Sequence, residues 1–321
     1  MAKKQIFIGV DMDSVSVRGV RLAFDPDKSG GNSTQSAWEL LSAAEVNGGN
    51  FLDDAQAVSA LKNLRENLKG RPSDKVSVCL SGKQTYAVRM DVRKIPEEEM
   101  AGMLRLELRK SMPFELSAAT IDYQILPTES NDNVYANAGV SVMVSAAADS
   151  YLERQAAIYG KAGLPPYHAD VLPVSVANAF WAACGDGAAE PEGAVLLLHL
   201  GADVCTLVID GRNAPFFSRA FSFNMSKTAG DDKTADISSS INILADEVTK
   251  SAAYYKNTNR INGISSISIS GAYASHPALD ELTNKTGYSV RVVQTASLVR
   301  AEKPLEPGKY DLAIALAMQA A

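Results

Sequence analysis

Cysteine and histidine, the residues that build many metal sites and disulfide frameworks, are scarce in this sequence. Its 321 residues include three cysteines and three histidines, widely spaced and without a CxxC or HExxH motif. Isolated thiols are typical of a protein from a reducing compartment, and a zinc site needs several such ligands at short spacing. We therefore expect neither a disulfide framework nor a resident metal ion.

Long apolar runs and an excess of basic residues are missing as well. The longest apolar stretches, such as Ala194 to Leu198, fall far short of the roughly 18 residues that a membrane-spanning helix needs. No signal peptide is recognisable at the N-terminus. The net charge of −6 lacks the basic excess that binds a phosphate backbone. These absences predict a cytoplasmic protein that binds no nucleic acid and reaches a membrane only indirectly.

Segments typical of strands alternate with segments typical of helices, which predicts an α/β protein. Residues 6–10 form an apolar run that favours a buried strand, and residues 14–22 alternate like a returning strand. The same strand, tight turn and returning strand recur from Val195, about 188 residues later. The segment 11–13 (DMD) then overlays the segment 199–201 (HLG). The repeat predicts two similarly folded lobes that face each other across a cleft.

A Gly- and Ala-rich linker divides the predicted elements into two lobes. We predict the first lobe over residues 1–190 and the second lobe over residues 191–321. Residues from about 84 to 138 interrupt the first lobe with a β-α-β-β block that has its own apolar stripe, which indicates an inserted subdomain. A long helix within about 225–263 predicts a small helical subdomain in the second lobe.

Polar residues gather at the two tight turns of the repeat. A hairpin turn that contains Asp, Gly, Ser or Thr can direct backbone N–H groups and hydroxyls at a phosphate, and a carboxylate can hold Mg²⁺ through water. The same residue types also suit tight turns without a ligand, so both interpretations stay open. The sequence has no Walker A motif. The candidate residues are Asp11, Ser14, Ser16 and Arg18 in the first hairpin, and Gly201 and Thr206 in the second.

Five segments, taken together and in their order along the chain, are informative about the fold. They are IGVDMDSVSVRGVRL, IPEEEMAGMLRLELRKSMPFELSAATIDYQIL, YLERQAAIYGKAGLPPYHADVLPVSVANAF, LHLGADVCTLVIDGRNAPFFSRAFSF and ISISGAYASHPALDELTNKTGYSVRVV. Together they resemble the actin-like superfamily and, within it, the PilM family of type IV pilus assembly proteins, relatives of the cell-division protein FtsA. The most specific part is residues 95–126, with an acidic helix start, a Pro-Phe step and an Asp-Tyr-Gln strand.

This resemblance implies an actin-like, ribonuclease H-like fold of duplicated lobes that carries the inserted β-α-β-β subdomain. It also implies a scaffold or adaptor of the inner-membrane platform that assembles a type IV pilus or a related secretion system. PilM-like proteins bind the cytoplasmic tail of the bitopic membrane protein PilN in a groove beside the insert, and they link the platform to the motor ATPases. The resemblance therefore places the chain at the inner face of the inner membrane, held there by partners. In several members the lobes bind ATP with Mg²⁺.

The nucleotide site that the resemblance implies is altered at three positions. Asp13 replaces a glycine, so a β-carbon and a negative charge stand where a phosphate would approach the backbone. His199 replaces the acid of the second turn, and Leu172 replaces the acid that would orient the attacking water. We therefore expect no hydrolysis, and weak or absent binding of ATP and Mg²⁺. The residues that do match are Glu247, Lys250 and Ser251 on the base side, where a solvated helix face is the alternative, and Gly271 at the adenosine-side turn.

The helix of the insert has more apolar positions than one core stripe requires. Methionine-rich surfaces suit adaptable peptide grooves. We expect an extended tail to dock beside this helix and the Pro113-Phe114 step, in contact with Met103, Leu104 and Phe114. The alternative is that these side chains fill the core of the insert.

Two other functions stay open at this point. A filament-forming, ATP-binding relative of FtsA has the same fold, and the sequence also leaves self-association open. A sugar- or phosphate-kinase-like enzyme uses paired hairpins too, but it needs a carboxylate base and glycines at both turns. The sequence supplies neither at the matching positions, so we predict a protein without enzymatic activity.

Overall fold

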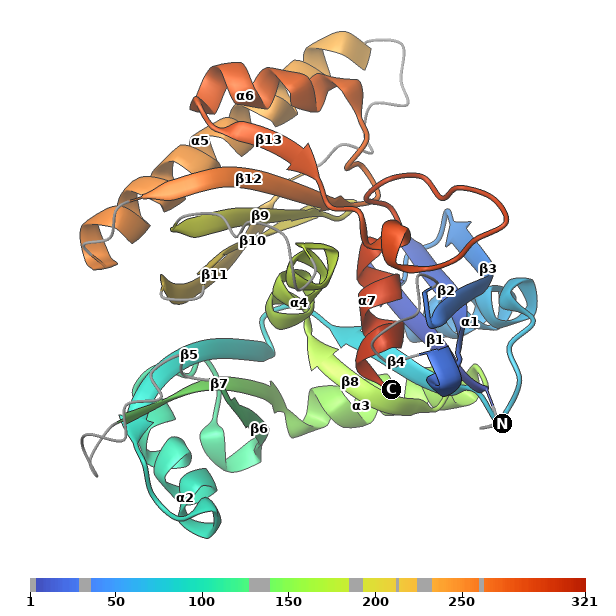
Figure 1. The fold of residues 1–321 in the computed structure, drawn as a ribbon, viewed down its shortest axis with the longest axis horizontal. Coiled ribbons are helices and arrows are strands. Elements are labelled where there is room, and N and C mark those ends of the chain that lie inside the picture. Colours follow the sequence, from blue (N-terminus) through green and yellow to red (C-terminus); the bar gives the residue numbers. More distant parts are fainter. Residues whose placement is uncertain are drawn as a thin grey trace.

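The computed structural model describes residues 4–28, 36–126, 139–184, 193–211, 214–223, 233–259 and 263–321. Strands and helices alternate along these residues, and the strands form three separate sheets. The α/β class predicted from the sequence is confirmed. Figure 1 shows two of the sheets in two lobes and the third sheet at the lower left.

The first sheet has the strand order β3-β2-β1-β4-β8. β1 pairs antiparallel with β2, and β2 with β3, whereas β4 and β8 extend the sheet in parallel from β1. Its central strands are buried along most of their length because helices cover both faces. The strands are β1 (Gln5–Met12), β2 (Ser16–Phe24), β3 (Trp38–Asn47), β4 (Lys75–Leu80) and β8 (Pro166–Val171).

The second sheet repeats this arrangement with the order β11-β10-β9-β12-β13. β9 pairs antiparallel with β10, β10 pairs antiparallel with β11, and β12 and β13 extend the sheet in parallel from β9. The duplication of the lobes predicted from the sequence is therefore present in the fold. The strands are β9 (Ala194–Leu200), β10 (Val204–Gly211), β11 (Ala214–Ser222), β12 (Ile264–Gly271) and β13 (Ser289–Val292).

The third sheet belongs to the insert and has the order β5-β7-β6, with both pairs antiparallel. The helix α2 buries Met100, Leu104 and Leu108 against it. β7 begins at Gly139, so this sheet continues past residue 138, the end that the sequence suggested for the insert. The elements are β5 (Thr85–Arg93), α2 (Glu97–Leu108), the 3₁₀ turn Leu116–Ala118, β6 (Ala119–Ile125) and β7 (Gly139–Ala148).

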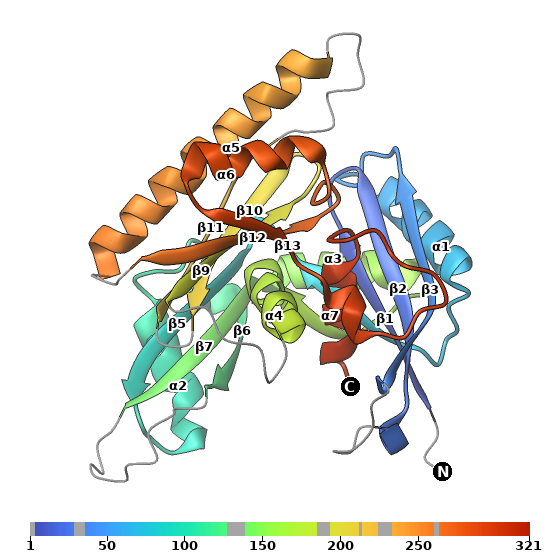
Figure 2. The ribbon, with the colours of Figure 1, turned by 45° about the horizontal axis from the view of Figure 1, so that its top comes forward.

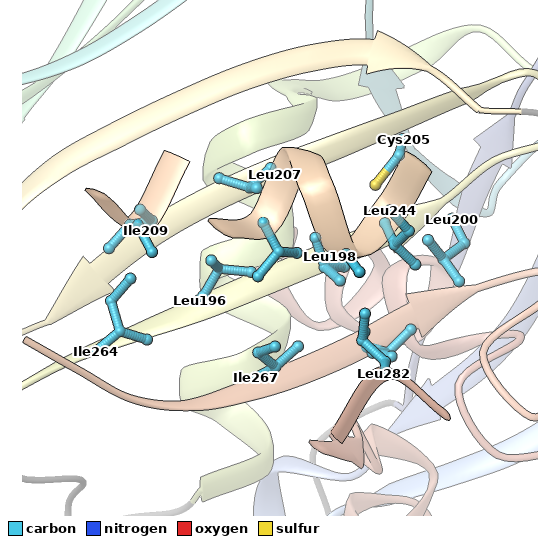
Figure 3. Packing of buried hydrophobic residues seen from close by; sticks show 14 of the residues in the cluster. Leu196, Leu198, Leu200, Cys205, Leu207, Ile209, Leu244, Ile264, Ile267 and Leu282 are labelled. Atoms are coloured by element: carbon cyan, nitrogen blue, oxygen red, sulfur yellow. The ribbon is translucent and has the colours of Figure 1, made fainter. Parts of the chain in front are cut away.

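Four helices cover the outer faces of the two main sheets (Figure 2). α1 (Asp54–Leu68) and α3 (Asp149–Lys161) pack on the first sheet, and α5 (Lys233–Asn259) and α6 (Asp280–Thr286) pack on the second. Figure 3 shows Leu244 of α5 among the β-strand residues Leu198 and Leu200. The structure describes residues 233–259 of the predicted 225–263 subdomain as one of the helices that cover the second sheet.

Two further helices, α4 (Leu172–Cys184) and α7 (Asp311–Gln319), lie between the lobes in both views. Phe180 of α4 packs against Leu197 of the second sheet, although α4 precedes the linker in sequence. Ile314 of α7 packs against Phe7 of the first sheet, although α7 ends the chain. The lobes therefore exchange helices. None of the helices in the described ranges has the length and apolarity to cross a membrane.

Candidate functional site

The two tight turns of the repeat have the same geometry. The Asp13 N–H donates to the Ser16 carbonyl oxygen at 2.9 Å, and the Gly201 N–H donates to the Val204 carbonyl oxygen at 3.0 Å. In the strand registers Asp11 lies opposite Arg18, and His199 lies opposite Thr206. The overlay of residues 11–13 on residues 199–201, predicted from the sequence, is confirmed.

The turns face each other across the lobes. His199 Nε2 lies 3.8 Å from Asp11 Oδ2, and a β-carbon built on Gly201 would lie 3.9 Å from Asp13 Cβ. His199 Nδ1 is 3.2 Å from Ser270 Oγ on the neighbouring strand β12. Burial lowers the pKa of His199, and this outweighs the opposing effect of the Asp11 charge, so the imidazole is neutral at pH 7. We call these residues and Arg18 the hairpin cluster.

Arg18 is the centre of the hairpin cluster and is fully buried. Its Nε and Nη2 donate to Asp11 Oδ2 at 3.1 and 2.8 Å, and Nη2 also donates to Asp13 Oδ2 at 3.1 Å. Its Nη1 lies 3.8 Å from Glu45 Oε1 of β3. Burial would raise the pKa of Asp11, but the charges of Arg18 and His199 and the Arg18 hydrogen bonds hold that pKa below its ordinary value. The first turn thus carries an ionised, buried carboxylate.

Asp13 binds the donors of its own turn. Its Oδ1 accepts the backbone N–H groups of Val15 and Ser16 at 2.9 and 2.8 Å, and its Oδ2 accepts the Ser16 hydroxyl at 2.9 Å. Arg18 Nη1 donates to Ser16 Oγ at 2.6 Å. These are the donors that the sequence suggested for a phosphate. The Ser14 hydroxyl is buried, and among the described residues it has no hydrogen-bond partner.

Gly271 lies beside the second turn, at the end of β12. Its φ is +100°, and a β-carbon there would come within 2.5 Å of the Leu200 carbonyl oxygen, so only glycine fits without strain. Thr206 is buried opposite His199. Leu172 opens α4 and packs into the apolar core between the lobes. The fold therefore brings the two predicted turns and Gly271 together.

The predicted base-side residues have their contacts elsewhere, within the second lobe. Glu247 Oε2 forms an ion pair with Arg219 Nη2 of β11, and Lys250 Nζ lies 3.4 Å from Glu247 Oε1. The Ser251 hydroxyl donates to the Glu247 carbonyl oxygen at 2.7 Å. These side chains form a local network between α5 and β11.

A groove of about 440 Å³ separates the insert from the first lobe. Its walls come from β6 and β7 of the insert, from β8 and α4 of the first lobe, and from the end of α7. Burial raises the pKa of Asp170 on its β8 wall, although hydrogen bonds from Ser175 and Val171 oppose this. The lining residues that matter below are Asp122, Met143, Asp170, Val174, Asn178 and Gln319. The resemblance implied a groove beside the insert, but its lining residues were not predicted from the sequence, because its walls come from segments far apart in the chain.

A second hollow, of about 830 Å³, lies at the C-terminal end of α2 and includes Pro113 and Phe114. Leu106 also lines it and is 65% exposed. Met103 packs partly against the core of the insert. Leu104 has no exposed surface and belongs to that core, so a peptide cannot contact it in the folded insert. The prediction that Leu104 touches a partner is wrong, because the 100-104-108 stripe is the buried face of α2.

Two five-stranded sheets of one topology, which exchange helices and oppose their first hairpins, define an actin-like α/β protein. A family model for type IV pilus assembly protein PilM matches residues 9–240. The chain belongs to this family.

Solved structures resemble the chain over nearly its whole length. A structure described as the PilM-PilN type IV pilus biogenesis complex aligns with a TM-score of 0.76 at 19% identity and covers 98% of both chains. The ethanolamine utilization protein EutJ from Carboxydothermus hydrogenoformans aligns with a TM-score of 0.49 at 12% identity, over 98% of this chain and 91% of EutJ. A Bacteroides thetaiotaomicron protein with an actin-like ATPase fold aligns with a TM-score of 0.46 at 12% identity, over 98% and 96%. No curated protein matches the sequence.

Proposed function

We propose that this protein is a scaffold of a type IV pilus assembly platform that binds the cytoplasmic tail of a PilN-like membrane protein in the groove between the insert and the first lobe. Membership in the PilM family and the likeness to a chain of a PilM-PilN complex support this proposal. Such binding would hold the protein at the inner face of the inner membrane through its partner. The groove itself supports this location, because its walls come from two separately packed units, the insert and the first lobe.

The groove has the features that an extended peptide requires. β6 and β8 are edge strands of their sheets, and an edge strand can pair with the main chain of an added segment. The side-chain amide of Gln319 lines the groove, and both its nitrogen and its oxygen are buried without a hydrogen-bond partner in the described structure. A peptide main chain supplies both a donor and an acceptor for such an amide. Asp122 and Asp170 favour a basic residue in the tail.

A matched pair of tryptophan substitutions tests the location. Asn178 is exposed on the α4 wall of the groove, and Ser117 is exposed in the second hollow beside Phe114. We expect Asn178→Trp to weaken binding at least about tenfold, because the indole fills the groove, and Ser117→Trp to change it less than about twofold. The measurement is fluorescence anisotropy with a labelled peptide of the N-terminal cytoplasmic residues of the PilN homologue from the same genome.

The reverse result would place the tail at the Phe114 hollow, the location that the sequence suggested. Equal affinity in wild type and in both variants would reject both locations. Unfolding curves of the two variants serve as the control for folding, since each substitution replaces an exposed side chain.

We further propose that the site formed by the two turns does not hydrolyse ATP and binds ATP with Mg²⁺ weakly or not at all. The hairpin cluster fits a triphosphate poorly, because Asp13 already accepts the Val15 and Ser16 N–H groups. Its carboxylate also repels an added phosphate at close range. The neutral His199 adds no carboxylate for a metal ion.

Calorimetry with Mg-ATP tests this second proposal. We expect the wild type to bind more weakly than about 1 mM, and Asp13→Gly to gain binding below about 1 mM, because the substitution frees two N–H donors and removes a charge. A micromolar dissociation constant for the wild type would contradict the proposal. So would ATP turnover that disappears in Asp11→Ala.

A further inference from the structure

Asp210 joins three parts of the molecule at one carboxylate. It lies near the end of β10, is 2% exposed, and stands opposite Val195 on the face of the second sheet that meets α4. Its Oδ1 lies 2.9 Å from Arg89 Nη2 of the insert strand β5. Its Oδ2 accepts the indole N–H of Trp181 on α4 at 2.7 Å. Asp210, which belongs to the second lobe, therefore binds both the insert and α4, a helix whose residues belong to the first lobe.

The Arg89 contact fixes the insert wall of the groove. Arg89 Nη1 donates to the carbonyl oxygens of Gly211 and Ala214 at 2.8 and 3.0 Å, so two hydrogen bonds and the ion pair with Asp210 hold its guanidinium against the second lobe. Across the β5–β7 pair, Arg89 lies directly opposite Met143, which lines the groove. Figures 1 and 2 both show β5 next to β11. A shift of the second lobe would therefore move β7.

The Trp181 contact fixes the opposite wall. Val174 and Asn178 line the groove from α4, and Trp181 follows Asn178 by three residues on the same side of the helix. A hydrogen bond of the indole to a buried carboxylate is charge-assisted and sets the rotation of the helix. Both walls are thereby held by one group that does not line the groove.

We infer that Asp210, with Arg89 and Trp181, is a positioning device that sets the width of the groove and couples tail binding to the placement of the second lobe. This inference rests on the proposed function of the groove. Because coupling is reciprocal, a bound tail also stabilises the placement of the second lobe that Asp210 maintains.

Tail affinity in single-contact variants tests the inference, with the labelled PilN-homologue peptide as probe. Arg89→Met removes the insert contact, and we expect it to weaken binding at least about tenfold. Trp181→Phe removes the N–H donor and keeps a smaller aromatic ring, and we expect a loss of about threefold. Arg89→Lys retains the charge opposite Asp210 but not the full set of hydrogen bonds, so its affinity should fall between those of Arg89→Met and the wild type.

A matched control separates positioning from general destabilisation. Arg21 pairs with the buried Asp74 at 2.8 Å within the first lobe and does not line the groove. We expect Arg21→Met to lower the unfolding midpoint yet leave tail affinity within about twofold. If Arg89→Met and Trp181→Phe bind the peptide as tightly as the wild type while Asn178→Trp still weakens binding, the inference is wrong but the proposed function stands. A wild type that does not bind the peptide would overturn the proposed function and this inference together.

Discussion

Replacement of Arg18 by methionine lowers the free energy of unfolding by about 3 to 5 kcal/mol, which is the usual cost of leaving a buried charge without its partner. Asp11 is 4% exposed and has Arg18 as its hydrogen-bonded cation, and Asp13 shares the same guanidinium. The variant keeps the bulk of the side chain but leaves these carboxylates uncompensated. Urea unfolding at pH 7 measures the difference.

The pH dependence of this loss has a definite sign. In the wild type the pKa of Asp11 is lowered, so its contribution to stability is present above the unfolded-state pKa and is lost as the pH falls through the folded-state pKa. In the variant, burial without a cation raises the pKa of Asp11, so protonation relieves the penalty. The difference in the free energy of unfolding between wild type and Arg18→Met should therefore become smaller as the pH falls below about 5.

Arg300→Met is the matched control for the Arg18 variant. Arg300 pairs with Glu39 at 3.0 Å, but its side chain is 51% exposed. An exposed pair of this kind contributes only about 0 to 1 kcal/mol. A loss in Arg18→Met no larger than that in Arg300→Met would contradict the view that the hairpin cluster stabilises the fold.

The hairpins were predictable from the sequence because their geometry is local. A tight turn fixes the register of its two strands, and alternation then decides which face each side chain occupies. Asp11 and Arg18 therefore had to be neighbours, and so did His199 and Thr206. The bonds from Asp13 to its own turn are local as well.

β3 was not predicted, and its sequence explains why. The segment WELLSAAEVN has no strict alternation and is rich in Ala, Leu and Glu, which are weak strand formers or good helix formers. It is a strand because it pairs along β2 over its whole length. Tertiary pairing outweighs local preference here.

The groove and its support depend on contacts between distant segments. Gln319 meets β6 and β8 only after α7 has crossed back to the first sheet. Arg89 meets Asp210 only because the insert packs against β11. No spacing within one segment carries such information, whereas the core stripe of α2 follows from spacing alone.

Gly9→Ala should destabilise the protein more than an ordinary core substitution, by at least about 4 kcal/mol. Gly9 is on β1, and α7 packs so closely on it that a β-carbon would lie 1.8 Å from the Ala313 carbonyl oxygen and 2.8 Å from the Ala317 N. Both neighbours are backbone atoms of a helix and cannot rotate away, so α7 has to leave β1. Thermal unfolding, with hydrogen exchange of the α7 amides, measures the effect.

Gly160→Ala is the control, because Gly160 lies in α3 and a β-carbon there meets nothing within 4 Å. Alanine is favoured over glycine in a helix by about 0.5 to 1 kcal/mol, so this variant should be slightly more stable than the wild type. The two substitutions add the same methyl group and should act in opposite directions. If Gly9→Ala unfolds like the wild type, the close contact between α7 and β1 does not hold the C-terminal helix on the first sheet. The packing of α7 on β1 would then not be what joins the C-terminal helix to the first lobe.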